Sequence, residues 1–158
     1  MSGTDIAAQL AAAETICSKN GTQLTSLRRE VLDLILRAAT PLTAYQLLDR
    51  LKSTRKSAVP PTIYRALEFL IENRLVHRIE RLNAFVPCGE ADHDHADAQF
   101  LICHQCGAVT EIEDHNVSAA LAQAAAARGF TPDRAIVELD GLCATCALPH
   151  TEAPPALR

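Results

Sequence analysis

The spacing of hydrophobic residues divides the chain into two unlike parts. Up to about residue 74, apolar residues recur every three or four positions, which is the period of an amphipathic helix. This pattern predicts four helices, over residues 5–20, 26–36, 44–52 and 62–74. A threonine, a favoured N-cap residue, precedes the second and third helices, and two prolines, which suit a first helical turn, precede the fourth.

Beyond Arg74 apolar and polar residues alternate, which is typical of strands. The segments LVHRIE and AFVPC predict a two-stranded hairpin with its turn at residues 81–83. Helices followed by such a hairpin have the outline of a winged helix, predicted for residues 1–85. Residues 86–98 are acidic and contain histidines without periodicity, so they predict a hinge and metal-binding loop.

The remaining residues predict a second, smaller module. Strands are expected at QFLIC, AVTEIE and RAIVEL, and a helix at VSAALAQAAAAR. A core of about fifty residues usually needs a bound metal or a partner subunit. We therefore predict an α+β fold, with an N-terminal winged helix-turn-helix domain, a small C-terminal α/β domain at 99–150 and a disordered tail at 151–158.

Charge follows the same division. Within a formal net charge of −4, residues 1–85 carry 12 Lys and Arg against 8 Asp and Glu, and residues 86–158 carry 3 against 11. A basic module is a candidate for binding nucleic acid, although chance variation of solvated faces gives similar counts. The N-terminus lacks the features of a signal peptide and no segment suits a membrane span, so we expect a cytoplasmic protein without membrane contact.

The fourth helix has the pattern of a recognition helix. Its apolar residues surround Ile63 on one face, while Tyr64 and Arg65 lie on the opposite arc near the N-terminus. In helix-turn-helix proteins such positions meet base edges in the major groove. The alternative is that Tyr64 packs at the rim of the core and Arg65 is a solvated charge. The preceding loop offers residues that would neutralise phosphates, namely Lys52, Arg55 and Lys56.

Two C-x-x-C pairs are the strongest chemical signal, and they consist of Cys103 with Cys106 and Cys143 with Cys146. In a reducing compartment, six cysteines indicate metal binding or redox chemistry rather than structural disulfides. Four thiolates suit a closed tetrahedral zinc site, which predicts a structural role. A thioredoxin-like redox pair is the alternative, and the presence of two matched pairs disfavours it.

A second, weaker set surrounds the predicted hairpin and comprises His77, Cys88, His93, His95 and Glu111. A mixture of imidazole, thiolate and carboxylate favours zinc over manganese or magnesium. Each residue alone has an ordinary structural explanation. Together they are a candidate site that would join the two modules.

The segments PPTIYRALEFL, LVHRIERLNAFVPC, FLICHQCGAVTEIE and GLCATC resemble the ferric uptake regulator family, and most closely its zinc-sensing branch, the zinc uptake regulators. The resemblance covers about residues 5–147. It implies a homodimer in which each subunit has a winged helix, a hinge and a dimerisation domain with a structural four-thiolate zinc site. Iron-sensing members have a histidine run of the H-H-x-H type directly before the first C-x-x-C, and this chain departs from that pattern.

The resemblance also implies the functional positions. The implied regulatory zinc ligands are His77, Cys88, His95 and Glu111, with His93 as the alternative to His95. The implied DNA-contacting residues are Tyr45, Tyr64 and Arg65.

These observations lead to one functional hypothesis. The resemblance implies a repressor of zinc-uptake genes that binds an AT-rich inverted repeat as a homodimer, and the two ligand sets predict one structural and one regulatory zinc ion per subunit. The alternatives are a sensor of iron or manganese and a thiol redox switch. An enzyme such as a zinc hydrolase or deaminase is disfavoured. The H-x-E sequence at 150–152 follows both cysteine pairs, and a four-thiolate site cannot easily activate water.

Overall fold

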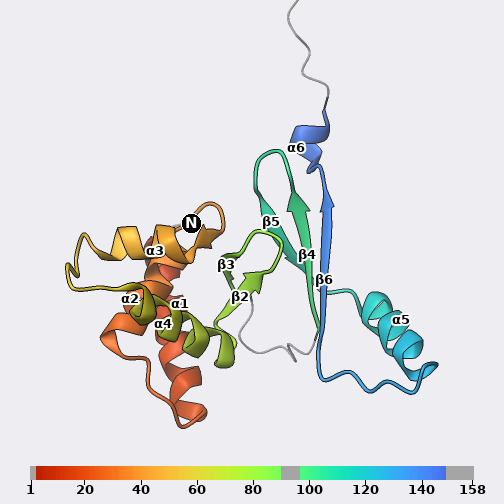
Figure 1. Cartoon of the computed structure of the whole chain (residues 1–158), viewed down its shortest axis with the longest axis horizontal. Helices are drawn as coiled ribbons and strands as arrows, with labels where there is room; N and C mark the ends of the chain where they lie inside the picture. The colour runs from red at the N-terminus through yellow and green to blue at the C-terminus, as the bar shows by residue number, and fades with distance from the viewer. Residues whose placement is uncertain (1–2, 90–96, 149–158) are drawn as a thin grey trace, which may run out of the picture.

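The computed structural model describes residues 3–89 and 97–148. Figure 1 shows a bundle of helices beside a β-hairpin, and a second sheet on the other side of that hairpin. The elements are α1 (Gly3–Lys19), α2 (Ser26–Leu36), β1 (Leu42–Thr43), α3 (Ala44–Leu51), α4 (Pro60–Glu72), β2 (Val76–Ile79), β3 (Ala84–Pro87), β4 (Asp97–Cys103), β5 (Val109–Ile112), α5 (His115–Ala126), β6 (Ala135–Gly141) and α6 (Ala144–Ala147). The α+β fold class is confirmed. The predicted tail lies outside the described residues, and the domain boundaries stay a prediction.

The helices of the N-terminal module bury their apolar faces in one core, with Leu47 and Leu70 fully inaccessible to solvent. Thr43 begins α3 with a capping box, in which its side chain accepts from the backbone N–H of Gln46 and the Gln46 side chain bonds back. Both prolines occupy the first turn of α4, as predicted. Thr25 is the N-cap of α2, but its side chain makes no capping hydrogen bond.

The hairpin of the wing is part of a three-stranded sheet in the order β1-β3-β2. His77 on β2 is paired with Val86 on β3, and the turn includes Asn83 at a positive φ of 46°, which asparagine tolerates better than most residues. The Cys88 N–H donates to the Leu75 carbonyl at 3.1 Å, so the chain stays beside β2 just past β3. The short strand β1 was not predicted.

The second sheet has the order β5-β4-β6, with β4 antiparallel to β5 and parallel to β6. Residues paired in register project to the same side, so Phe100 and Glu138 share one face and Leu101 and Leu139 share the other. The wing covers the first face, where Ile79 packs against Phe100 in a small core of its own. The second face leaves Leu101 and Leu139 exposed.

The helix α5 follows β5 and extends from one end of the second sheet, away from the helical bundle (Figure 1). The Asp114 side chain caps it by accepting from the backbone N–H groups of Asn116 and Val117. None of its described side chains is buried within this chain. Among the described residues, no helix is long and apolar enough to cross a membrane.

Candidate metal centres and nucleic-acid interface

The fold brings the four cysteines of the two C-x-x-C pairs together. Their sulfur atoms all lie within 4.8 Å of one another, and the Sγ atoms of Cys106 and Cys143 are 3.8 Å apart. Zinc–sulfur bonds of about 2.3 Å in a tetrahedron require sulfurs separated by about 3.8 Å. The donor atoms therefore fit a closed zinc site.

The turns around the cysteines explain this convergence. Cys103 ends β4 and Cys106 lies in the turn to β5, where Gly107 adopts a left-handed φ of 73° and donates its N–H to the Cys103 carbonyl at 2.9 Å. Cys143 is the N-cap of α6, and Cys146 lies in that helix. Because β4 and β6 run parallel, both pairs meet at the same end of the sheet.

The thiols do not ionise independently. Backbone N–H groups, first of Cys106 and then of Cys143, lower the pKa of the Cys103 thiol to about 6. The neighbouring sulfurs, led by Cys143, raise the pKa of the Cys146 thiol to about 12. Accumulating thiolate charge thus opposes further ionisation, and a cation at the centre would offset it.

A second cluster lies between the wing and the other sheet. His77 of β2, Cys88 just after β3 and Glu111 of β5 have ligand atoms within 4.8 Å of one another. The Nε2 atom of His77 lies 3.0 Å from Oε1 of Glu111, whose other oxygen accepts from the Gly89 N–H at 3.0 Å. We call these three residues the inter-domain cluster.

The environment of His77 holds a proton on the imidazole in the metal-free chain. Its side chain is only 14% exposed and meets the Phe100 ring edge-on, with centroids 5.3 Å apart. Burial alone would lower the pKa of His77, but hydrogen bonds to Cys88 and Glu111 raise it to about 9. A metal ion would replace this proton and keep a positive charge between the thiol and the carboxylate.

The inter-domain cluster supplies an imidazole, a thiol and a carboxylate, a donor set that fits zinc. A four-coordinate site needs one further ligand. The two candidates from the sequence, His93 and His95, lie outside the described residues. The choice between them stays a prediction.

The candidate DNA-reading residues are exposed side chains of α3, α4 and the loop between them. Tyr45 at the start of α3 is 71% exposed and Tyr64 on α4 is 45% exposed, which is unusual for aromatic side chains with nothing to cover them. Arg65, Lys52 and Lys56 are exposed as well. The apolar face of α4 around Ile63 is buried, so the predicted orientation of this helix is confirmed.

Arg55 is placed differently from the two lysines of the same loop. Its Nε donates to the Glu30 carboxylate at 2.6 Å and its Nη2 donates to the Ser26 hydroxyl at 3.1 Å. Thr54 also donates to Glu30. The hydrogen bonds from Arg55 and Thr54 lower the pKa of Glu30, and the one from Arg55 has the larger effect. Arg55 therefore anchors the loop to α2, and the expectation that it neutralises DNA phosphate stays untested.

One contact between the modules was not predicted from the sequence. Glu138 of β6 accepts hydrogen bonds from the wing turn, and Arg81 of that turn pairs with Asp140. The available signal was the alternation in the segment VELD, which places two acidic residues on one face of the strand.

The model of the ferric uptake regulator family matches residues 19–139. The chain belongs to the ferric uptake regulator family. Within it, the zinc uptake regulation protein of Escherichia coli (strain K12) is 40% identical over 137 residues, which are 87% of this chain and 80% of that protein. A zinc uptake regulator complexed with zinc and DNA has a TM-score of 0.86 at 39% identity, covering 89% of this chain and 94% of the other.

Two forms of another family member, XcZur, are informative together. Its holo crystal structure has a TM-score of 0.80 at 43% identity, with 87% of this chain and 96% of the other covered. Its apo crystal structure has a TM-score of only 0.51 at 40% identity, with 92% and 99% covered. The modules of this chain are therefore arranged as in the holo form, and the two XcZur forms differ in overall arrangement.

Proposed function

We propose that this chain is a zinc-responsive repressor of zinc-uptake genes, a DNA-binding regulator rather than an enzyme. One observation carries the proposal: the inter-domain cluster joins the wing to the second sheet in a chain arranged like a zinc- and DNA-bound family member. An ion held there would connect ligands from both modules and supply the positive charge that the site otherwise takes from a proton. We take residues 1–85 as the DNA-binding domain, 86–98 as the hinge and 99–150 as the dimerisation domain of a cytoplasmic protein.

Each subunit would hold two zinc ions with separate roles. The four-cysteine cluster would keep the end of the chain folded onto β4, because structural zinc contributes folding free energy directly. His77, Cys88 and Glu111, with His95 or alternatively His93, would form the regulatory site. Its ligands come from elements far apart in the chain, so occupancy would favour the docked arrangement of the winged helix over undocked ones. A differential affinity of a few kcal/mol would change operator occupancy about a hundredfold.

The operator would be read by the exposed surface of α3 and α4. Arg65 would bind a guanine edge, and Tyr45 and Tyr64 would meet thymine methyl groups or phosphates. Lys52 and Lys56 would bind phosphates, so affinity should weaken steeply with salt. The family resemblance implies an AT-rich operator. We expect it to be an inverted repeat, because two winged helices in a two-fold dimer meet half-sites of opposite orientation.

The dimer would form through the open face of the second sheet. Leu101 and Leu139 are exposed there, and Phe130, after α5, is 65% exposed. The helix α5 has no buried side chain of its own, and a second copy would cover both this helix and the uncovered sheet face. The open sheet face lies opposite the face that the wing covers.

The direct test is operator binding by fluorescence anisotropy against buffered free zinc. Cys88→Ala should raise the free zinc concentration needed for half-maximal operator binding by more than about tenfold. Changing a residue that only orients a metal ligand already weakens metal binding by about tenfold or more, and loss of the ligand itself should weaken it further. Cys17→Ala is the matched control, because it removes a thiol that is buried in the helical core and belongs to neither cluster. Equal zinc dependence of Cys88→Ala and wild type would exclude the proposed sensor.

Two rival functions are separated by related measurements. For a sensor of iron or manganese, the free Fe²⁺ or Mn²⁺ concentration at half-maximal operator binding would lie within the range available in the cell, and the corresponding zinc concentration would lie above it. A thiol switch would lose the zinc of its four-cysteine cluster, and with it operator binding, under mild peroxide. The zinc-sensor proposal expects neither result.

A further inference from the structure

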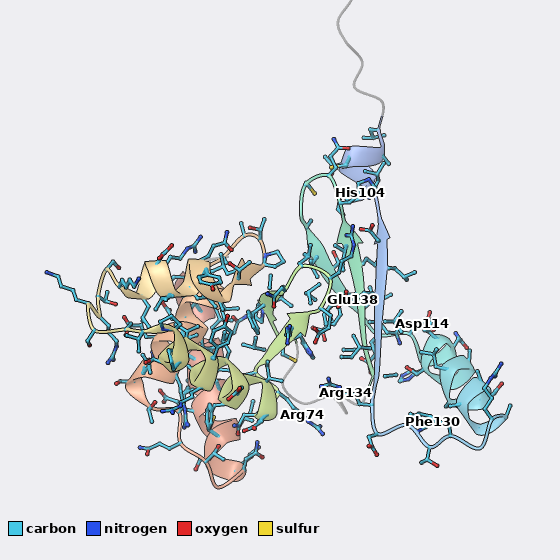
Figure 2. The ribbon with its side chains drawn as sticks, in the orientation of Figure 1. Arg74, His104, Asp114, Phe130, Arg134 and Glu138 are labelled. Atoms are coloured by element: carbon cyan, nitrogen blue, oxygen red, sulfur yellow. The ribbon has the colours of Figure 1, made fainter. Side chains whose placement is uncertain are left out.

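The turn of the wing is attached to β6 through residues that are not candidate metal ligands. Glu138 accepts two hydrogen bonds from consecutive backbone N–H groups, at 2.6 Å from Glu80 N to Oε1 and at 3.1 Å from Arg81 N to Oε2. The Arg81 guanidinium also donates to the Asp140 carboxylate at 2.6 Å. Figure 2 labels Glu138 on the second sheet, beside the hairpin. We call this set of interactions the wing-turn contact.

The geometry is specific for a carboxylate. Each oxygen of Glu138 faces one N–H, and hydrogen bonds to an ionised acceptor are about twice as strong as neutral ones. A glutamine would keep one carbonyl oxygen but turn its NH₂ group toward the second N–H, so that two donors would meet. A change from carboxylate to amide at this position therefore weakens the contact while nearly preserving the shape of the side chain.

The wing-turn contact and the inter-domain cluster hold the same hairpin at two points. His77 lies within β2, and Glu80 follows that strand directly. Between them Ile79 is fully buried against Phe100, the register partner of Glu138 on the second sheet. The apolar contact alone lets the hairpin slide or rotate, because such contacts are non-directional. The two polar attachments define one orientation.

We propose that Glu138 is a positioning residue for the zinc response. Through the wing-turn contact it stabilises the docked arrangement of the winged helix, the same arrangement that brings His77 and Cys88 to Glu111. This inference rests on the proposed function for its link to zinc. Its structural part, that the carboxylate of Glu138 holds the wing turn on β6, is independent of the proposed function.

A contact of this kind sets the zinc sensitivity of the regulator. When only a fraction of zinc-free molecules has the docked arrangement, the apparent zinc affinity is the intrinsic affinity multiplied by that fraction. The wing-turn contact increases the docked fraction without touching the ligands. Weakening it should therefore raise the zinc concentration needed for operator binding and leave the affinity at saturating zinc nearly unchanged.

The test compares Glu138→Gln with Asp133→Asn, in protein that keeps its four-cysteine zinc. Asp133 lies in the loop before β6 and has no ion pair or side-chain hydrogen bond with the described residues, so its variant removes the same charge from the same module. Hydrogen exchange of the Glu80 and Arg81 amides is measured by NMR without regulatory zinc. We expect at least one of these amides to exchange about tenfold faster in Glu138→Gln, equivalent to about 1.4 kcal/mol, and neither to change in Asp133→Asn.

Zinc titration of operator binding is then run on the same three proteins. Glu138→Gln should need about three- to tenfold more free zinc for half-maximal binding and should reach the wild-type affinity at saturation, which also shows that it is folded. Unchanged amide exchange would overturn the contact, and faster exchange with an unchanged zinc requirement would overturn its role in the response. A failure of the proposed function is distinguishable, because wild type would then bind its operator equally with and without regulatory zinc.

Discussion

Zinc binding at the inter-domain cluster should strengthen as the pH rises toward 9, because the ion and a proton compete for His77. The pKa of about 9 means that the imidazole is almost fully protonated at pH 7. Freeing it there costs on the order of 3 kcal/mol, because two pH units separate the pKa from pH 7. Zinc binds only the neutral imidazole, so this one group should raise the apparent affinity about tenfold per pH unit between 7 and 9. A histidine with an ordinary pKa of about 6.5 would contribute almost no pH dependence to zinc affinity above pH 7.5.

The raised pKa of His77 also makes the stability of the protein depend on pH when regulatory zinc is absent. The pKa of His77 is raised in the folded state, so its contribution is fully present below about pH 6.5 and is lost as the pH rises through about 9. Zinc should therefore stabilise the protein most at the alkaline end of this range. There the proton no longer supplies the positive charge between Cys88 and Glu111.

The assay is a competition titration against a chromophoric zinc chelator, in half-unit steps from pH 6.5 to 9. Glu111→Gln is the informative variant, because it removes a carboxylate that raises the pKa of His77 while keeping the side-chain shape. Its affinity will be lower throughout, but the slope between pH 7.5 and 9 should be flatter than in wild type. A wild-type affinity that is flat over this range, after correction for chelator protonation, would refute the reasoning.

Three further perturbations test other parts of the structure. Cys103→Ser should lower the zinc content by one ion per subunit and unfold or monomerise the C-terminal module, measurable by metal analysis and sedimentation. Ile79→Ala should reduce the free energy of unfolding in urea by about 2–4 kcal/mol, because it opens a cavity in the small core that joins the wing to the second sheet. Lys56→Ala should reduce the magnitude of the slope of log affinity against log salt by about one, which corresponds to one phosphate contact. Arg55→Ala should cost at most about 1 kcal/mol of stability, since the pair of Arg55 with Glu30 lies near the surface.

Local patterns were sufficient for most of the elements. The helix that begins at Pro60 and the face it buries around Ile63 follow from a period of 3.6 residues and from proline's fixed φ. The capping box at Thr43 was only half visible in the sequence, because a threonine suggests a cap but the answering Gln46 side chain depends on its rotamer. The strand β1 was missed, since two residues are too few to show alternation and pair only because β3 lies beside them.

The sequence by itself determined each C-x-x-C pair and the residue types of the second site, whereas the parallel pairing of β4 with β6 brought the two pairs together. Each C-x-x-C pair lies in one local turn, and residue types alone limit the metal. Only the tertiary structure decided which residues meet across the modules. Three contacts join positions more than twenty residues apart in the chain. They are the contact of Glu111 with His77, the ion pair of Arg55 with Glu30, and the hydrogen bonds of Glu138 to the wing turn. No local period records such distances, because they depend on how two sheets and a helical core pack once formed.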